Sequence, residues 1–452
     1  MSLDRRHMLL SSGALATWLT ARAKAAPAGV PSGNGYFLSK ANPVATRDQK
    51  ELEELCLRLL AHPDVQAGAT RAKAMWARAF DHSALPELWA TFDAAMADYC
   101  FRSIMVAANS DAAYPRVFRV YSPAGHWLGH DVPASRWGSE NPDNCYRIIP
   151  VEQGGSYRIT GQRGTNPPSS VSYTLVADTD TSITLGLLDQ RDLVISSDGM
   201  FVITLDDQPT NGRPNHIQMP SDARYVFIRD SMGDWRQTPN ALRAERINPP
   251  GRQPLSMDEL ARRAARAMLT GVYFEVFNLQ TTRNTPVNTM SKPILAGAIG
   301  GLKTQVNSMG WFRLADDEAA IITADPVDSA YRSFVLYDFW CRSLEYRDRQ
   351  TSLNNAQMAA DADGRVTIIV AHRDPGVQNW IDTTGLHETS GGFRWQGLPG
   401  NIAAAPGITT RVVKFAELAS ALPPGVKHID AAERARQMAE RKTLFDRRFV
   451  DS

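Results

Sequence analysis

The stretch DADGRVTIIVAHRDPGVQNWIDTTG, residues 361–385, reads as a turn, a strand, a proline-broken loop and a short Asn-Trp-Ile element before a second turn. Residues 196–220, SSDGMFVITLDDQPTNGRPNHIQMP, keep the same order of Asp-Gly, apolar run, proline, Asn, ring residue and Ile. A strand that carries an arginine follows each copy, at Arg229 and at Arg394. This shared order predicts an internal duplication.

The duplication extends to the segments that precede the two copies. SVSYTLVADTD (170–180) stands before the first copy as AYRSFVLYDFW (330–340) stands before the second. From Tyr114 onward, short β-rich runs alternate with clusters of Gly, Pro, Asn and Asp at a spacing typical of β-sandwiches. We therefore expect a mainly β protein with helical additions: two related β-sandwich or jelly-roll domains, an N-terminal helical layer and a helical insert between the sandwiches.

Helical periodicity marks the parts that surround the predicted sandwiches. Leucines recur at helical spacing from Leu52 to Leu60, and Ser256 with Glu259 forms a Ser-x-x-Glu capping box that opens a second helical region. The expected organisation is an export signal at 1–25, the helical layer at 36–110, the first β domain at 111–245, the helical insert at 255–300, the second β domain at 301–415 and a charged C-terminal helix at 427–452.

The overall composition is that of an ordinary globular protein. Of 452 residues, 43% are hydrophobic and 21% charged, and the length favours two or three domains. There are 49 basic against 48 acidic residues, so the net charge gives no electrostatic reason to expect a nucleic acid partner.

The N-terminal residues resemble a twin-arginine export signal. Arg5 and Arg6 precede a weakly apolar run from Met8 to Leu19, and Ala-x-Ala sequences that end at Ala23 and Ala25 follow. The alternative is a basic amphipathic N-terminus. No later stretch approaches the roughly 18 apolar residues of a membrane span. We expect a periplasmic or secreted protein whose mature form does not cross the membrane.

Four cysteines, Cys56, Cys100, Cys145 and Cys341, show no Cys-x-x-Cys spacing, which argues against a metal ribbon or a thioredoxin-like motif. Cys56 and Cys100 lie in predicted helices and could form a disulfide. Their apolar neighbours equally favour buried free thiols.

Two stretches resemble a bacterial family of unknown function. WGSENPDNCYRIIPVEQGGSYRITGQRGT (137–165), taken with DPGVQNWIDTTGLHETSGGFRWQG (374–397), is similar to the domain-of-unknown-function family numbered twelve-fourteen. The resemblance implies a C-terminal jelly-roll-like β domain in a secreted or periplasmic protein, and it extends from about residue 110 to 415. It implies no particular reaction, and this chain differs in having Arg394 only two residues after Gly392.

A histidine pair at 126–130, GHWLGH, has metal-ligand spacing only on a helix. On a strand, His126 and His130 would lie about 13 Å apart along one face, too far to share an ion. Flanking Gly125, Gly129 and Pro133 favour turns and strands, so we expect no metal site here.

The candidate site is instead the edge of the C-terminal sandwich, where aromatic planes with Arg, Asn and His suit an oxygenated ring compound. His387 has no counterpart in the first repeat, which makes it the candidate general acid or base, with Asp382 nearby. Asn215 and Asn379 occur in both copies and are interpreted as structural. The predicted substrate-binding residues are Trp340, Arg347, Trp380, Arg394 and Trp395. Alternatively, Trp380 and Trp395 pack in the core.

No Gly-x-Ser-x-Gly elbow, Walker loop or dinucleotide-binding Gly-x-Gly-x-x-Gly lies between a predicted strand and helix, so we expect no organic cofactor. The favoured hypothesis is an exported enzyme that uses acid–base chemistry on a carbohydrate or polycyclic small molecule. The alternative is a non-catalytic ligand-binding or assembly protein built from paired sandwiches. The pattern leaves the oligomeric state open.

Overall fold

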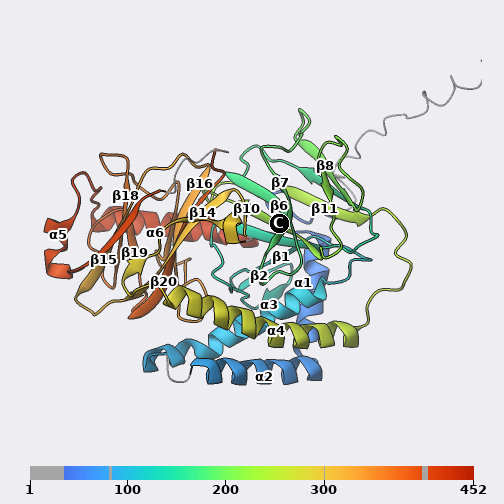
Figure 1. The fold of residues 1–452 in the computed structure, drawn as a ribbon, viewed down its shortest axis with the longest axis horizontal. Coiled ribbons are helices and arrows are strands. Elements are labelled where there is room, and N and C mark those ends of the chain that lie inside the picture. Colours follow the sequence, from blue (N-terminus) through green and yellow to red (C-terminus); the bar gives the residue numbers. More distant parts are fainter. Residues whose placement is uncertain (1–34, 81–83, 300, 400–405, 452) are drawn as a thin grey trace, which may run out of the picture.

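Two β-sandwiches lie side by side, and a layer of helices runs along one side of both (Figure 1). The computed structural model describes residues 35–80, 84–299, 301–399 and 406–451. The predicted export signal, residues 1–25, lies outside the described residues. This architecture confirms the expected mainly β fold with helical additions.

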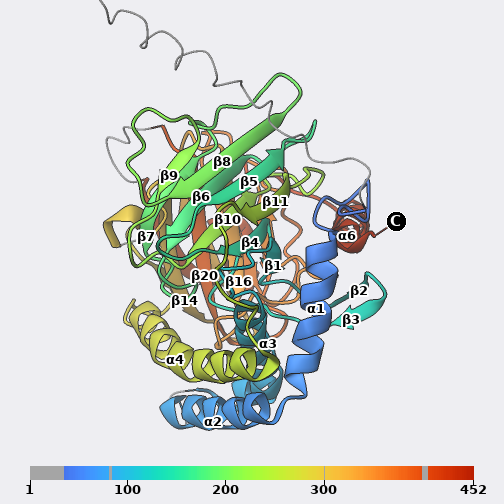
Figure 2. The same ribbon diagram turned by 90° about the vertical axis from the view of Figure 1, so that its right-hand side faces the viewer.

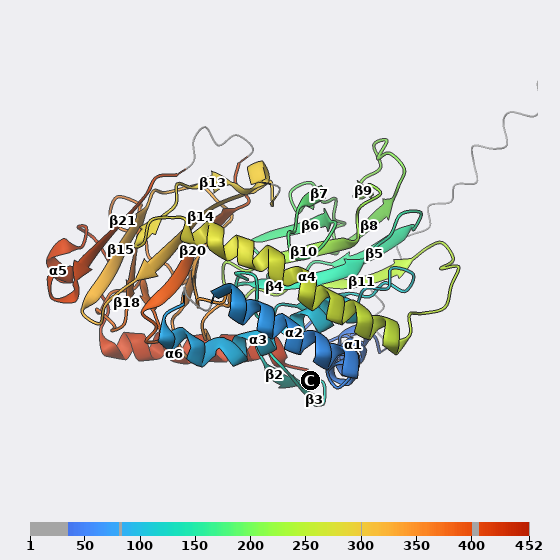
Figure 3. The ribbon, with the colours of Figure 1, turned by 60° about the horizontal axis from the view of Figure 1, so that its bottom comes forward.

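The helical layer combines the N-terminal helices with the predicted insert. Its helices are α1 (Arg47–Leu60), α2 (Pro63–Phe80), the 3-10 helix η1 (Pro86–Thr91), α3 (Phe92–Ala108) and α4 (Met257–Arg283). α4 packs along α2 and α3 and passes across both sandwiches (Figure 3). Gly68 on α2 permits this contact, because a Cβ there would lie 2.8 Å from the Cα of Ala265 on α4.

The capping box predicted for α4 is half correct. The Ser256 hydroxyl accepts a hydrogen bond from the backbone N–H of Glu259 at 3.2 Å, as an N-cap should. The Glu259 carboxylate binds Arg262 and Arg263, at 3.0 and 3.2 Å, because these arginines lie three and four residues later on the same helix face.

The first sandwich packs a five-stranded sheet against a four-stranded sheet. Its core includes Ile159, Tyr173 and Val226, all buried. In spatial order, the larger sheet has β1 (Phe118–Val120), β4 (Asn144–Pro150), β10 (Tyr225–Ser231), β6 (Ser170–Val176) and β7 (Thr184–Asp189), and the smaller has β11 (Ala241–Arg246), β5 (Tyr157–Gln162), β8 (Met200–Asp206) and β9 (His216–Gln218).

The second sandwich has the same design around a core that includes Phe334, Ile368 and Trp395. In spatial order, its larger sheet has β12 (Thr289–Met290), β14 (Gln305–Arg313), β20 (Glu388–Gln396), β16 (Tyr331–Tyr337) and β17 (Ser352–Asn354), with β13 (Ile294–Leu295) also on β14. The smaller sheet has β21 (Ile408–Lys414), β15 (Glu318–Ala324), β18 (Val366–Ala371) and β19 (Trp380–Asp382).

The strand orders of the two sandwiches correspond position by position, which confirms two related domains. The parallel strand pairs also correspond, because β9 pairs with β8 and β19 pairs with β18 in parallel orientation. Arg229 lies opposite Ser172, and Arg394 lies opposite Ser333. Ser172 therefore corresponds to Ser333 in the strand register. Aligning segments 170–180 and 330–340 by their first residues is wrong by one position, because the register sets which residues correspond.

Asn215 and Asn379 have the same structural role in the two copies. The Asn215 amide both accepts from the backbone N–H of Val194 and donates to its carbonyl, each at 2.7 Å. Asn379 bonds Ala359 in the same way, at 2.8 and 2.7 Å. The structural interpretation is correct: each asparagine fastens the segment that precedes β8 in the first sandwich or β18 in the second.

We expect Asn379→Ala to lower the free energy of unfolding by about 1–3 kcal/mol, because it leaves the backbone groups of Ala359 and the buried carbonyl of Thr367 without this partner. Urea unfolding checks this. Asn379→Asp should also be destabilised, because its second carboxylate oxygen would face the carbonyls of Ala359 and Thr367, to which the amide now donates. Equal stability of wild type and Asn379→Ala would contradict the structural role.

The C-terminal helix α6 (Ala431–Asp446) is held to the second sandwich by two buried arginines. Arg434 pairs with Asp374 at 2.9 Å, and Arg441 donates to the carbonyl of Tyr346 at 2.6 Å. The following 3-10 helix η4 (Arg447–Phe449) reaches the region of α1 and the hairpin β2 (Gly125–Trp127)–β3 (His130–Val132), seen at one side in Figure 2. The remaining short elements are η2 (Ala296–Ile299), η3 (Phe415–Glu417) and α5 (Leu418–Ala421).

All four cysteines are buried free thiols, so Cys56 and Cys100 form no disulfide. Across the described residues, no helix combines the length and the apolar character that crossing a lipid bilayer requires.

Candidate active site between the two sandwiches

The central strands β10 and β20 each turn one face toward the other sandwich. In β20, Phe393 and Trp395 belong to the sandwich core, so the alternating Arg394 and Gln396 face outward toward the first sandwich. Across the interface, Ser231 on β10 donates a hydrogen bond to the Gln396 side chain at 2.6 Å. The equivalent faces of the two repeats therefore meet each other.

A polar cavity of about 160 Å³ lies at this meeting point. Both repeated arginines, Arg229 and Arg394, line it. A water needs about 10–15 Å³ on the same measure, so the cavity has room for a small organic molecule. The other lining residues are Tyr121, Trp137, Gly138, Ser139, Glu140, Asn144, Tyr146, Thr179, Asp180, Ser182, Phe227, Glu275, Gln305 and Gln396.

The two arginines differ in how firmly they are held. Arg394 donates to the Tyr337 hydroxyl and, at 2.8 Å, to the carbonyl of Ser139. Arg229 donates only a 3.3 Å bond to the Thr174 hydroxyl, and its guanidinium lies 4.2 Å from the Phe227 ring centre. No carboxylate in the described part of the chain forms an ion pair with Arg229, and burial lowers its pKa. Arg229 thus keeps donors for a bound oxyanion.

Glu275 supplies a carboxyl group from α4. The residue is 2% exposed, and its Oε2 atom has no hydrogen-bond partner among the described residues. Its Oε1 lies 3.8 Å from a guanidinium nitrogen of Arg102. Burial outweighs this attraction and raises the pKa of Glu275 to about 8. A carboxyl whose pKa is raised in this way is suited to donate a proton to a ligand.

A second carboxyl, Glu140, lines the same cavity. Burial raises the pKa of Glu140 to about 7, although the hydroxyl and the backbone N–H of Ser343 both donate to it. Burial thus raises the pKa of two carboxyls that line the same cavity as two arginines, which makes them candidates for proton transfer.

Three non-glycine residues with strained backbone conformations line this cavity. Tyr121, Ser139 and Ser182 all line it and all have left-handed φ angles, of 57°, 55° and 50°. Such conformations are costly for residues other than glycine and occur preferentially at functional sites.

The residues predicted to bind substrate are scattered, and of them only Arg394 lines the central cavity. Trp395 stacks on Phe393 in the sandwich core, with ring centres 4.2 Å apart. Trp340 is fully buried, and its indole N–H donates to the carbonyl of Leu88 at 3.1 Å. Trp395 therefore packs in the core, as the alternative interpretation expected. Trp340, in the turn after β16, contacts the helical layer, so neither side chain lines an edge site.

The other predicted residues also have structural contacts. Arg347 pairs with Asp446 on α6 at 2.6 Å. Half-buried Trp380 donates to the carbonyl of Ala371 at 3.0 Å, and Asp382 pairs with Arg349 at 2.6 Å. These contacts attach α6 and stabilise the loop that follows β19.

His387 connects the helical layer to the second sandwich. Its Nδ1 lies 2.8 Å from Glu87 and its Nε2 lies 3.0 Å from Asp316. These hydrogen bonds raise the pKa of His387. Both ring nitrogens are therefore engaged by carboxylates, which suits an ion-paired connection better than proton transfer to a substrate.

His372 and Asp316 bring possible metal-ligand atoms within 4.8 Å of those of His387. The two ring nitrogens of His372 already bond the carbonyl of Leu314 at 3.1 Å and the hydroxyl of Thr383 at 2.7 Å. Hydrogen bonds therefore account for the positions of the His372 and His387 rings in the described structure. His126 and His130 bond different carboxylates, those of Asp131 at 2.7 Å and Glu53 at 3.0 Å.

We expect His387→Gln to destabilise the protein more at about pH 5.5 than at about pH 9. The pKa of His387 is raised above 6.5, so its ion pairs contribute fully below pH 6.5 and are lost as the pH rises through the folded-state pKa. Thermal unfolding at both pH values measures the difference. Glu87→Gln should show the same pH trend, and an unchanged difference across the pH range would contradict it.

Sequence reasoning missed Glu275, Glu140 and Tyr121. One signal was present: Arg229 and Arg394 follow the asparagines of the repeated motif, Asn215 and Asn379, by 14 and 15 residues. A second was the lone acid Glu275 within the apolar run MLTGVYFEVFNL.

A search of solved structures finds similarity to an uncharacterized protein from Burkholderia cenocepacia, with 29% sequence identity and a TM-score of 0.66. The match covers 80% of this chain and 99% of the Burkholderia chain. A protein from Vibrio parahaemolyticus matches with 11% identity and a TM-score of 0.40, over 71% of this chain and 99% of its own. No model of a known protein family matches the chain, and no curated protein does.

Proposed function

We propose that this protein is an enzyme that uses acid–base chemistry on a small, oxygen-rich molecule in the cavity between its sandwiches. One observation carries the proposal: the buried carboxyl of Glu275, whose Oε2 has no hydrogen-bond partner among the described residues, lines the same cavity as Arg229, which forms no ion pair with a described carboxylate. A buried group without a partner is costly, and a ligand that bonds both residues removes that cost.

The lining residues suggest the class of substrate. Arg229 presents guanidinium donors for a carboxylate or another oxyanion. The stacked rings of Tyr146 and Phe227, with centres 5.6 Å apart, offer an apolar surface for a sugar ring. We therefore favour a carboxylated sugar or a small hydroxy acid.

In this proposal Glu275 is the general acid. Its Oε–H bond breaks as the proton passes to an oxygen of the substrate, which leaves Glu275 as a carboxylate beside Arg102. The positive charge of Arg102, 3.8 Å away, stabilises that carboxylate.

A ligand screen tests the proposal. Sugar acids and small hydroxy acids are screened with the purified protein by thermal shift, and mixtures that shift the melting temperature are analysed for product by mass spectrometry. Arg229→Gln should abolish the shift, whereas Arg158→Gln, which alters an exposed arginine on β5, should keep it. Binding without product would identify a ligand-binding protein, and a shift that survives Arg229→Gln would reject the cavity as the site.

We also propose export by the twin-arginine route, which rests on residues 1–25, and membership of the family of unknown function that the sequence resembles. We expect Arg5→Lys combined with Arg6→Lys to retain a folded precursor in the cytoplasm. Wild-type protein should appear in the periplasm, shortened near Ala23 or Ala25. Cell fractionation and mass measurement of the mature N-terminus check both, and an unshortened cytoplasmic wild type would reject export.

A further inference from the structure

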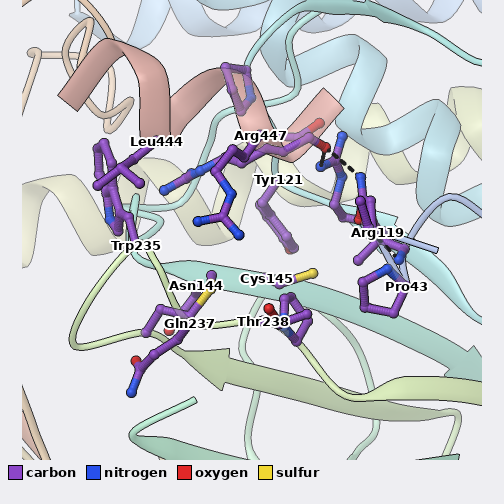
Figure 4. Close-up of a pocket in the computed structure, with 18 of the residues that line it drawn as sticks. Pro43, Arg119, Tyr121, Asn144, Cys145, Trp235, Gln237, Thr238, Leu444 and Arg447 are labelled. Carbon is purple, nitrogen blue, oxygen red and sulfur yellow. Dashed lines mark hydrogen bonds between the residues drawn. The ribbon is translucent and has the colours of Figure 1, made fainter. Parts of the chain in front are cut away.

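A second cavity, of about 70 Å³, lies where η4 meets the first sandwich (Figure 4). Figure 4 shows Arg447 on one side of it, Asn144 and Cys145 of β4 on the opposite side, and Trp235 and Arg119 at its two ends. Three arginines line this cavity, and none of its lining residues is an Asp or a Glu. An excess of positive charge of this kind favours an anion.

Arg119 is the most buried of the three arginines, at 7% exposure. Its Nη1 donates to the carbonyl of Arg448 at 3.3 Å, but its Nε and Nη2 have no hydrogen-bond partner among the described residues. The guanidinium is held over the Trp127 ring, 4.5 Å from its centre. Burial lowers the pKa of Arg119, and it outweighs the opposing attraction of the nearby Glu53 carboxylate.

Arg447 and Arg448 complete the cluster from η4. The Arg448 guanidinium lies 4.5 Å from the ring centre of Trp235, and its Nη2 is buried without a hydrogen-bond partner. Within the described parts of the chain, neither arginine forms an ion pair with a carboxylate, although the charge of Arg448 acts on the buried carboxyl of Asp143. Aromatic rings hold the guanidinium groups of Arg119 and Arg448 in place, so little side-chain entropy of these two residues is lost when an anion binds.

Three other buried arginines among the described residues are bonded to a carboxylate or to backbone carbonyls. Arg147 pairs with Asp230, and Arg434 pairs with Asp374. Arg441 donates to Tyr346 and to the carbonyl of Ser352 at 3.1 Å. Among the described buried arginines, Arg119 stands out because two of its nitrogens, Nε and Nη2, lack a hydrogen-bond partner.

We propose that this cavity binds a tetrahedral oxyanion, either free phosphate or the phosphate group of a small organic molecule. Three guanidinium groups match the charge and the several acceptor oxygens of phosphate. At about 10–15 Å³ per water, a volume of 70 Å³ has room for one such group. Tyr121 and Asn144 line this cavity and the central one, so an anion here would contact the wall of the candidate active site.

This proposal does not depend on the chemistry assigned to Glu275. Its test is isothermal titration calorimetry of the full-length mature protein with inorganic phosphate and with glucose 6-phosphate, at constant ionic strength set with chloride. Arg447→Gln is the main variant, because Arg447 is exposed and its change should not disturb folding. Arg262→Gln removes the same charge from exposed α4 and is the matched control.

We expect saturable binding of phosphate to wild type and to Arg262→Gln. In Arg447→Gln the Kd for phosphate should rise by about tenfold or more, as the loss of one charge-assisted bond implies. Arg119→Gln should also lose phosphate binding, with its folding checked by circular dichroism. Tighter binding of glucose 6-phosphate than of phosphate would identify an organic phosphate as the ligand. Absence of saturable binding, or equal affinity in Arg447→Gln and wild type, would overturn the site.

Discussion

Glu275→Gln should abolish turnover of the substrate that binds in the central cavity and leave its binding nearly unchanged. Glutamine has the shape and a donor group of the protonated glutamic acid, but it cannot transfer a proton. Loss of a general acid typically lowers kcat by about 10²–10⁴-fold. Steady-state kinetics with the substrate found by the screen measure this, and an unchanged kcat would remove Glu275 from the mechanism.

The same variant has an effect on stability that can be measured without a substrate. The pKa of Glu275 rises from 4.5 to about 8 on folding, so between these values the unfolded chain ionises while the folded protein keeps its proton. Wild type therefore loses stability relative to Glu275→Gln as the pH rises from 4.5 to about 8, and the difference stays constant above that. Urea unfolding at several pH values checks this, and a difference independent of pH would contradict the raised pKa.

Asp230→Asn should lower the free energy of unfolding by about 3–5 kcal/mol, because it leaves the buried charge of Arg147 without its counterion. Arg147 and Asp230 are 2% and 0% exposed, and they lie inside the first sandwich on β4 and β10. Asp230 is also the neighbour of Arg229, so its loss should weaken ligand binding in the central cavity. Chemical unfolding and the thermal-shift screen measure the two effects.

The control for this experiment is Glu245→Gln, which breaks an exposed pair with Arg158 on neighbouring strands. Exposed ion pairs contribute about 0–1 kcal/mol, so this variant should unfold close to wild type. If Asp230→Asn were no less stable than Glu245→Gln, the buried pair would not stabilise the fold.

Much of the fold was predictable because the evidence for it repeats along the chain. The Asp-Gly turn, the apolar run and the Asn before β9 and β19 occur twice, and both copies form the same strands in the same order. Local patterns of this kind depend on turn chemistry and on the period of a strand, which act over a few residues.

The candidate site was less predictable because it depends on which face of each strand points to the sandwich core and which face contacts the other sandwich. Arg394 and Trp395 are adjacent in sequence, yet one lines the central cavity and the other lies in the sandwich core. His387 was predicted as a catalytic group, but Glu87, 300 residues earlier, engages its ring. No local pattern contains such distant contacts.

The sequence by itself determined two duplicated sandwiches, the helices beside them and the equivalent positions of Arg229 and Arg394, because these follow from turns, periodicity and repetition. Only the tertiary structure decided that the two arginines share a cavity with Glu275, and that Arg119 and Arg447 share another. The reason is physical: burial and the absence of a partner define both sites, and these arise only when strands and helices far apart in the sequence pack together.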